Sequence, residues 1–287
     1  MANTDSHPEF IQIETNIACN AKCPFCPQKT MTRTPRRMPD DVWMKIIDDT
    51  RGLGITYRPF MINEPLSDSR MGEIMRYIRK DGTAQIDLNT NGELMTEEMA
   101  AEILDAGIEV IRFSIDGFSE ETFSHSRVGV DYQRTVERTL RFIELAKTRG
   151  GAGRIEVRMI DLDVNRHEQE DYKRFWSKAG AVPIITSFYR WPWEPGVEGV
   201  NLPCLKILDE MFFYVNGKAT LCCWDAHERA VIGDVTKDHV LDIWNGALNQ
   251  LYRSHLARGR RDQILLCSRC EAYKDRQFEG FPVAYQS

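Results

Sequence analysis

Strand-like and helix-like hydrophobic patterns alternate along the first two thirds of the chain. Short apolar or period-two runs predict strands at residues 10–14, 58–62, 84–88, 109–115, 154–160 and 182–188. Runs with helical spacing predict helices at residues 40–49, 71–79, 132–147 and 168–178, and a further helix that begins after Thr96. Asp40 and Thr96 are the predicted N-caps of their helices. Val136, Leu140 and Ile143 share one face of the longest helix.

This order of elements predicts an α/β fold with parallel strands, because strands joined through helices return in the same direction by right-handed crossovers. A closed barrel takes eight such units and about 250 residues. Six units that end near residue 188 therefore predict an open (β/α)6 partial TIM barrel. In such sheets, functional sites gather at the carboxyl ends of the strands.

A breaker-rich segment at residues 190–196 ends the alternation. Beyond it, Asn216 and Gly217 form the strongest two-residue hairpin signal, between predicted strands at 212–215 and 219–221. Short helices are predicted at 240–244 and 247–257. We therefore expect a barrel domain of residues 1–195, followed by a smaller domain of residues 196–287.

Composition narrows the class of protein. A formal charge of −6 over 287 residues argues against a general nucleic-acid binder, whose affinity rests on cations that neutralise phosphates. No run approaches the roughly 18 apolar residues of a membrane span, and the N-terminus lacks the apolar core of a signal peptide. We expect a cytoplasmic protein that binds no membrane. Its eight cysteines then indicate metal ligands rather than disulfides.

Three of the cysteines follow the first predicted strand. Cys19, Cys23 and Cys26 are spaced C-x3-C-x2-C, and Pro24 and Pro27 make a helix there unfavourable, since proline inside a helix costs about 3 kcal/mol. Three thiolates in a loop can hold three irons of a four-iron cube and leave the fourth iron open. A zinc loop is the alternative, but it would need a fourth ligand nearby, and the next hundred residues offer only the distant His125.

The segment 19–26, Cys-Asn-Ala-Lys-Cys-Pro-Phe-Cys, resembles the signature of the radical S-adenosylmethionine (radical SAM) superfamily, including the aromatic residue before the third cysteine. The resemblance covers about 180 residues and implies a (β/α)6 partial barrel. It also implies that the open iron chelates the amino and carboxylate groups of S-adenosylmethionine. One electron would then release a 5′-deoxyadenosyl radical that removes a hydrogen atom from the substrate.

Shorter matches to this family follow later strands. Residues 61–65 resemble its G-G-E-P segment, with the glycines replaced, so that only Glu64 carries over as a partner of the methionine amino group. Asn91 lies in a T-N-G turn, Ser114 and Asp116 lie in an S-x-D-G segment, and Arg127 lies where related enzymes often direct an arginine toward the cofactor carboxylate. The resemblance thus implies five cofactor-binding residues. Each could instead be a turn or core residue.

The second set of cysteines predicts an auxiliary cluster. Four thiolates complete the ligation of a [4Fe–4S] cube, and these four are Cys204, Cys222, Cys267 and Cys270. Their order, with a hairpin before the second cysteine and a helix before the final C-x2-C, resembles the SPASM and twitch domains. The spacing is most similar to that of the 2-deoxy-scyllo-inosamine dehydrogenase family, which has one auxiliary cluster. Structural zinc on the same four thiolates is the alternative.

Cys223 beside Cys222 is left over. One interpretation is a buried, apolar packing residue or a spare metal ligand. The other is a hydrogen-atom donor that faces the substrate, and the protein would then be an epimerase. Asp225 or the nearby His227 could act as a base toward a substrate hydroxyl. Further candidates of the same kind are Glu194, Asp161 and Asp163.

Three reactions fit these residues. The first is dehydrogenation of a secondary alcohol with the auxiliary cluster as electron acceptor, which the resemblance to the cyclitol dehydrogenases favours. The second is radical epimerisation through Cys223, and the third is modification of a ribosomal peptide. A non-catalytic cluster or zinc protein is the alternative from another class. By fold-level analogy, the expected substrate is a small polar molecule of natural-product type: a sugar, aminocyclitol or aminoglycoside.

Two further expectations concern partners and aromatic residues. The resemblance implies a flavodoxin or ferredoxin as the reductant. Trp191 and Trp193 could stack on a sugar ring, although packing between the two domains is the simpler prediction.

Overall fold

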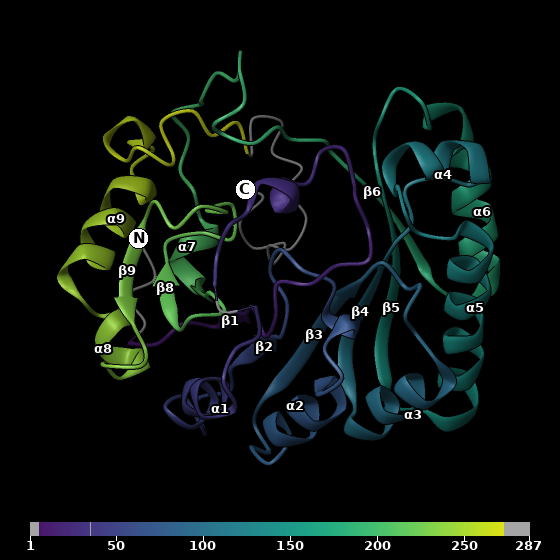
Figure 1. Ribbon diagram of the computed structural model, residues 1–287, viewed down its shortest axis with the longest axis horizontal. Helices are drawn as coiled ribbons and strands as arrows, with labels where there is room; N and C mark the ends of the chain where they lie inside the picture. The colour runs from purple at the N-terminus through teal and green to yellow at the C-terminus, as the bar shows by residue number, and fades with distance from the viewer. Residues whose placement is uncertain (1–5, 35, 273–287) are drawn as a thin grey trace.

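The computed structural model describes residues 6–34 and 36–272, which build one nine-stranded sheet with helices on its outer face (Figure 1). Six parallel strands form the partial barrel: β1 (Phe10–Ile13), β2 (Thr56–Arg58), β3 (Gln85–Thr90), β4 (Ile108–Ser114), β5 (Ala152–Ile160) and β6 (Val182–Thr186). The expected α/β class and (β/α)6 barrel are therefore confirmed.

Helices connect successive barrel strands and cover the outer face of the sheet. They are α1 (Asp40–Asp48), α2 (Met71–Ile78), α3 (Glu97–Ala106), α4 (Glu120–Ser126), α5 (Tyr132–Arg149) and α6 (Gln169–Ala179). Single 3-10 turns lie at Pro27–Thr30, Pro65–Ser67, Arg166–Glu168 and Arg261–Gln263. The outward side chains of β4, Ile111 and Phe113, are fully buried beneath these helices, whereas Arg112 and Ser114 alternate with them on the inner face. The apolar core thus lies outside the barrel, and its interior is polar.

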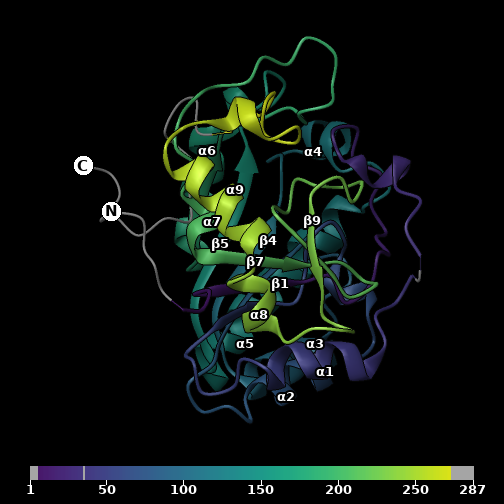
Figure 2. The same cartoon turned by 90° about the vertical axis from the view of Figure 1, so that its left-hand side faces the viewer.

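The C-terminal part extends the same sheet rather than forming a separate one. Its strand β7 (Glu210–Phe213) pairs in parallel with β1, and the antiparallel strands β8 (Lys218–Thr220) and β9 (Val231–Asp234) follow. Figure 2 shows β7 and β1 side by side. The helices of this part are α7 (Lys206–Asp209), α8 (Val240–Trp244) and α9 (Ala247–Ala257). None of the helices described is long and apolar enough to span a bilayer.

Several local expectations are wrong. The predicted strand at 58–62 lies earlier, because Pro59 has no N–H for the ladder and β2 ends at Arg58. Pro39, not Asp40, is the N-cap of α1, and the Asp40 carboxylate instead accepts a hydrogen bond from the Trp43 indole. Thr96 caps α3 as predicted, through Met99 N–H.

The hairpin and the longest helix also differ in detail from their predictions. Asn216 keeps a negative φ and only Gly217 is left-handed, so β7 and β8 are joined by a longer turn than the two-residue type. On α5, Ile143 is buried as expected, but Val136 and Leu140 are only half-buried. The buried face is centred on Thr135, Thr139, Phe142 and Ile143.

Candidate functional site

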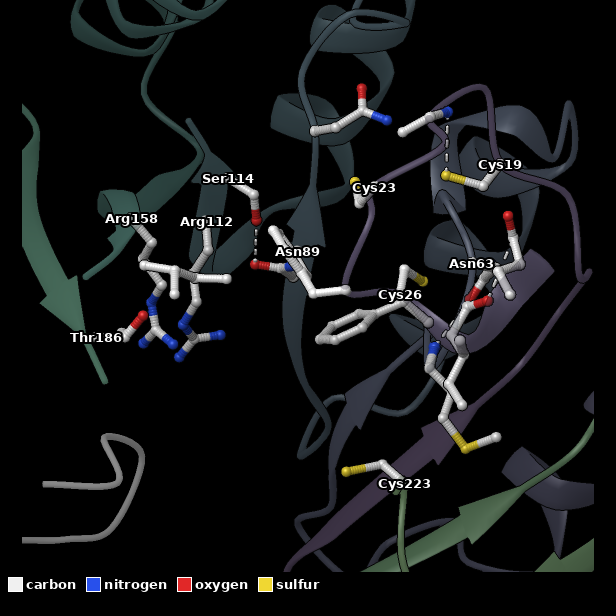
Figure 3. Close-up of a pocket in the computed structure, with 18 of the residues that line it drawn as sticks. Cys19, Cys23, Cys26, Asn63, Asn89, Arg112, Ser114, Arg158, Thr186 and Cys223 are labelled. Carbon is white, nitrogen blue, oxygen red and sulfur yellow. Dashed lines mark hydrogen bonds between the residues drawn. The ribbon is translucent and has the colours of Figure 1, made fainter. Parts of the chain in front are cut away.

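One cavity of about 470 Å³ lies at the inner face and carboxyl ends of the barrel strands. It brings together residues from the Cys19–Cys26 loop, from the ends of β2–β6 and from the loop after β8. All three cysteines of the first set line it, together with Cys223 and all five residues expected to bind the cofactor. Figure 3 shows these cysteines on one side of the cavity and Arg112, Arg158 and Thr186 on the other.

The three cysteines of the loop form a shallow metal cradle. Cys26 N–H donates to the Cys23 carbonyl at 3.0 Å, which turns the chain so that both thiols face the cavity. Ala21 N–H lies 3.4 Å from Cys19 Sγ, and an Arg127 nitrogen lies 3.8 Å from Cys23 Sγ. Burial raises the pKa of the Cys19 thiol to about 12 and also raises that of Cys26. These thiols therefore stay protonated unless a metal offsets the thiolate charge, as an iron–sulfur cluster would.

Glu64 connects two of the predicted segments. Its buried carboxylate accepts hydrogen bonds from the Thr90 hydroxyl at 2.6 Å, from Asn91 N–H at 2.7 Å and from Leu66 N–H at 3.1 Å. Burial raises the pKa of Glu64 despite these donors. The carboxylate lines the cavity and also fixes the turn that carries Asn91, so it can meet an ammonium group there.

Asp116 and Arg127 form a second connected pair. Arg127 Nε donates to Asp116 Oδ2 at 2.7 Å, and the other carboxylate oxygen accepts from Ile160 N–H at 2.8 Å. Ser114 donates to Asn89 Oδ1 at 3.4 Å, as Figure 3 shows. The structure thus places the five residues in one cavity with the cysteine loop. Their contact with a cofactor remains a prediction.

Sequence reasoning missed the charged inner wall of the barrel. Arg58, Arg112, Arg158 and Lys206 all line the cavity, as does Glu210. A signal for them existed in the sequence. Each arginine follows an apolar or aromatic residue within a strand, at the alternate positions that face inward, where a fully buried parallel strand would carry only apolar side chains.

The second set of cysteines lines a separate, smaller cavity. Cys204, Cys222, Cys267 and Cys270 meet there among Pro192, Leu256, Leu266 and Trp224. Burial raises the pKa of Cys204 to about 11 and also raises those of Cys267 and Cys270. Trp224 N–H lies 3.5 Å from Cys222 Sγ. Four cysteines that line one cavity suit a closed cluster.

Across residues 6–34 and 36–272, no group of three His, Cys, Asp or Glu side chains is arranged to hold a single metal ion. Two clusters remain the prediction for these cysteines, with zinc as the alternative.

The neighbours Cys222 and Cys223 face different cavities. Cys222 lines the smaller cavity, whereas Cys223 lines the barrel cavity. Trp224 and Lys206 line both. The doublet therefore lies at the wall between the two predicted metal sites, and Cys223 is presented toward any substrate in the barrel.

Asp225 does not reach the cavity, which removes the basis for its expected role as a base. It is fully buried, and its carboxylate accepts from the Thr220 hydroxyl at 2.9 Å and from the N–H groups of Ala230 and Arg229 at 2.7 and 2.9 Å. It organises the turn between β8 and β9. His227, Glu194, Asp161 and Asp163 also lie outside the residues that line the cavity.

Trp191 and Trp193 act in packing at the mouth of the cavity. Their rings stack at 5.2 Å, and the Trp191 indole donates to the Phe25 carbonyl at 2.6 Å. Trp191 also contacts Trp224, at 5.1 Å between centroids. This aromatic group ties the connection after β6 to the cysteine loop and to the C-terminal part.

Comparison with known families assigns the chain. The model of the radical SAM superfamily matches residues 13–175, more than half of the sequence. The chain belongs to the radical SAM superfamily. The model of the SPASM iron–sulfur cluster-binding domain matches residues 204–271, the stretch that carries the second set of cysteines. The expected subgroup is thereby confirmed, while the domain boundary near residue 195 stays a prediction.

Curated radical SAM relatives differ in activity. The chain is 25% identical over 185 residues to a tungsten-containing aldehyde ferredoxin oxidoreductase cofactor-modifying protein of Pyrococcus furiosus, covering 62% of this chain and 51% of that protein. It is 28% identical over 228 residues to a probable GTP 3′,8-cyclase of Methanothermobacter marburgensis, covering 78% and 72%. An AdoMet-dependent heme synthase of Methanosarcina barkeri is 31% identical over 144 residues, covering 49% and 39%. The chain thus spans about half the length of the Pyrococcus protein.

Two solved structures show the same fold. BtrN in complex with AdoMet and 2-DOIA has a TM-score of 0.72 at 16% identity, covering 96% of this chain and 99% of that one. The structure of anSMEcpe with bound AdoMet and the Cp18Cys peptide has a TM-score of 0.66 at 15% identity, covering 94% and 91%. At these identities the likeness establishes the fold and leaves the substrate open.

Proposed function

We propose that the chain is a radical SAM oxidoreductase that removes a hydrogen atom from a small polar substrate and oxidises a secondary alcohol of it. Cys19, Cys23 and Cys26 would hold one [4Fe–4S] cluster, and Cys204, Cys222, Cys267 and Cys270 a second. The observation that carries the proposal is a single cavity that joins the first cysteine set to a charged wall suited to a polar molecule. The choice of an alcohol rests on the resemblance of the cysteine spacing to the cyclitol dehydrogenase family, by fold-level analogy.

The bound cluster and S-adenosylmethionine supply a radical that takes the hydrogen atom from the carbinol carbon. In this proposal Glu64 meets the ammonium group of the cofactor, while the ion pair of Asp116 and Arg127 fixes the opposite side of its pocket. The hydroxyl proton of the substrate leaves to water or to a cavity carboxylate such as Glu210. A cluster held by Cys204, Cys222, Cys267 and Cys270 would accept the remaining electron, and the product would be a carbonyl.

A second candidate function, radical epimerisation, is favoured by the place of Cys223. Its thiol lines the barrel cavity while its neighbour faces the auxiliary site. A thiol S–H bond is weak enough to give a hydrogen atom to a carbon radical. The thiyl radical that results would need one electron and one proton, and the adjacent cluster could relay the electron from a flavodoxin- or ferredoxin-type donor.

The test uses the anaerobically reconstituted full chain reduced with dithionite. We expect about eight irons per chain, and formation of 5′-deoxyadenosine from S-adenosylmethionine. Cys26→Ala should abolish 5′-deoxyadenosine, whereas Cys223→Ala should retain both iron and cofactor cleavage. A colourless protein, or cleavage that survives Cys26→Ala, contradicts the assignment.

The same preparation separates the two reactions. With a converted sugar, cyclitol or aminoglycoside, oxidation lowers the product mass by two hydrogens and persists in Cys223→Ala. Epimerisation leaves the mass unchanged, incorporates one deuterium from heavy water and stops in Cys223→Ala. Either result rejects the other reaction.

A further inference from the structure

Seven charged groups, five of them buried and two (Arg112 and Arg158) partly buried, form a continuous series of ion pairs along the inner wall of the barrel. Ion pairs join them in the order Lys206, Glu210, Arg58, Asp87, Arg112, Glu156, Arg158. The nitrogen–oxygen distances are short: 2.6 Å for Lys206–Glu210, 2.7 Å for Arg58–Glu210, 2.8 Å for Arg58–Asp87 and 2.8 Å for Arg158–Glu156. The chain begins and ends with a cation, so its four cations exceed its three carboxylates by one.

The side of this ion-pair series that faces the cavity is more positively charged than four cations against three carboxylates suggest. All four cations line the cavity, but of the three carboxylates only Glu210 does. Asp87 and Glu156 lie behind the arginines that they bridge. Burial, together with repulsion from Arg158 and Arg58, lowers the pKa of Arg112 to about 9. The wall therefore holds like charges close together at a position that water reaches poorly.

The arginines also keep hydrogen-bond donors available. Each uses its other guanidinium nitrogens on carboxylates, while Arg58 Nη2, Arg112 Nη2 and Arg158 Nη1 make no hydrogen bond to any described part of the chain. Figure 3 shows the guanidinium groups of Arg112 and Arg158 side by side. Planar donors so arranged match the oxygens of a carboxylate or phosphate.

The arginines lie at different levels of the barrel relative to Ser114, one of the residues expected to bind the cofactor. In the sheet register, Arg158 is opposite Ser114, and Arg112 lies two residues further from the carboxyl end of β4. Two residues of a strand span about 7 Å. A molecule anchored at the arginines can therefore extend toward Ser114 and the cysteine loop, with Cys223 also on the cavity wall.

We propose that the substrate carries an oxyanion, a carboxylate or a phosphate ester, and that Arg58, Arg112 and Arg158 bind it at the inner end of the barrel cavity. This inference rests on the proposed function and narrows its substrate class to acidic sugars or cyclitols and their phosphates. A polyamine such as an unmodified aminoglycoside would meet like charge here. Lys206 contributes positive potential from the opposite end of the chain.

The experiment measures anion binding by calorimetry on the reconstituted full chain with saturating S-adenosylmethionine, at constant ionic strength. The probes are inorganic phosphate, glucose 6-phosphate, glucuronate, glucose and 2-deoxystreptamine. We expect phosphate or at least one acidic sugar to bind, and each anion that binds to do so at least about tenfold more tightly than glucose, as one or more charge-assisted hydrogen bonds allow. Binding of glucose 6-phosphate alone identifies a phosphate group, and binding of glucuronate alone identifies a carboxylate.

Substitutions locate the site. Arg158→Gln should weaken anion binding at least about tenfold, and Arg158→Lys less, because lysine retains the charge but not the planar donors. Glu156 keeps its ion pairs with Arg112 at 3.1 Å and with the exposed Arg154 at 2.7 Å in both variants, which preserves the fold, and circular dichroism checks this. The control is Arg141→Gln on the outer helix α5, where the arginine is 50% exposed and pairs with Glu97 at 2.8 Å. The anion affinity of Arg141→Gln should stay within twofold of that of the wild-type chain.

Three outcomes would overturn the inference: equal effects of Arg158→Gln and Arg141→Gln, tighter binding of 2-deoxystreptamine than of any anion, or binding of a peptide without dependence on Arg158. Formation of 5′-deoxyadenosine without substrate is measured separately. If the wild-type chain cleaves the cofactor but binds none of the anions, this inference alone is rejected. If the wild-type chain binds an anion but does not cleave the cofactor, the proposed function alone is rejected.

Discussion

Replacing Asp87 by Asn should destabilise the protein strongly, although the side chains have nearly the same shape. Asp87 is 2% exposed and bridges two arginines, the buried Arg58 at 2.8 Å and the partly buried Arg112. Loss of its charge leaves two cations facing each other in a poorly solvated wall. Removing one partner of a buried ion pair costs about 3–5 kcal/mol. With an unfolding entropy of about 2.1 cal/mol/K per residue, this lowers the Tm of a 287-residue chain by about 5–8 °C.

The control for Asp87→Asn is Asp105→Asn at the surface. Asp105 pairs with Arg149 at a similar distance, 2.7 Å, but its side chain is 67% exposed. Exposed pairs contribute only about 0–1 kcal/mol, so the Tm should move by less than about 2 °C. Differential scanning calorimetry of both variants, each with intact clusters, measures the difference.

Asp87→Asn should strengthen the binding of phosphate, although it destabilises the fold. Without the Asp87 charge, the excess of cations on the wall rises from one to two, so inorganic phosphate should stabilise Asp87→Asn more than wild type. Equal Tm losses for Asp87→Asn and Asp105→Asn would show that water screens the barrel wall, and the electrostatic reasoning would then be wrong.

Two further predictions concern local structure. Burial alone would raise the pKa of Glu168, but hydrogen bonds from two hydroxyls and two N–H groups outweigh it and lower the pKa. Its contribution is present above the unfolded pKa of about 4.3 and is lost as pH falls through the lower folded value. Glu168→Gln should therefore flatten the acid limb of a stability–pH curve, whereas the control Glu137→Gln, at an exposed position of α5, should leave it unchanged. Gly217→Ala and Gly52→Ala both place alanine at a positive φ, but only at Gly217 would the new methyl meet a side chain, Thr236, at 2.8 Å. Urea denaturation should show Gly217→Ala to be less stable than Gly52→Ala by about 1–3 kcal/mol, and equal losses would contradict the steric argument.

The barrel could be predicted because its signals are local. Apolar alternation and helix caps such as Thr96 fix the order of strands and helices, and the order of parallel units fixes the topology. The helix α4 was missed even though Ser119 caps it, since a seven-residue helix has too few turns to show periodicity. The short strand β9 was missed for the same reason of length.

The candidate site was predictable where residue type alone restricts the chemistry. Cysteine spacing identified both metal-binding sets, and turn motifs identified residues that the fold brings into one cavity. The position of Asp225 outside the cavity could not be predicted, because sequence adjacency to Cys223 does not fix the direction of a side chain. Its carboxylate instead accepts hydrogen bonds from four donors. The charged wall was missed because its partners, such as Arg58 and Glu210, are 152 positions apart and meet only in three dimensions.

The pairing of β7 with β1 has a consequence for dissecting the protein. The ladder runs from Phe10 to Ile13 on one side and from Glu210 to Phe213 on the other. A fragment cut after residue 195 would expose the backbone edge of β1, a strand whose Ile11 and Ile13 are wholly buried in the intact chain. Bare apolar edges recruit other chains and aggregate. The N-terminal part should therefore precipitate when expressed alone, and co-expression with residues 196–287 is the rational route to a soluble split enzyme.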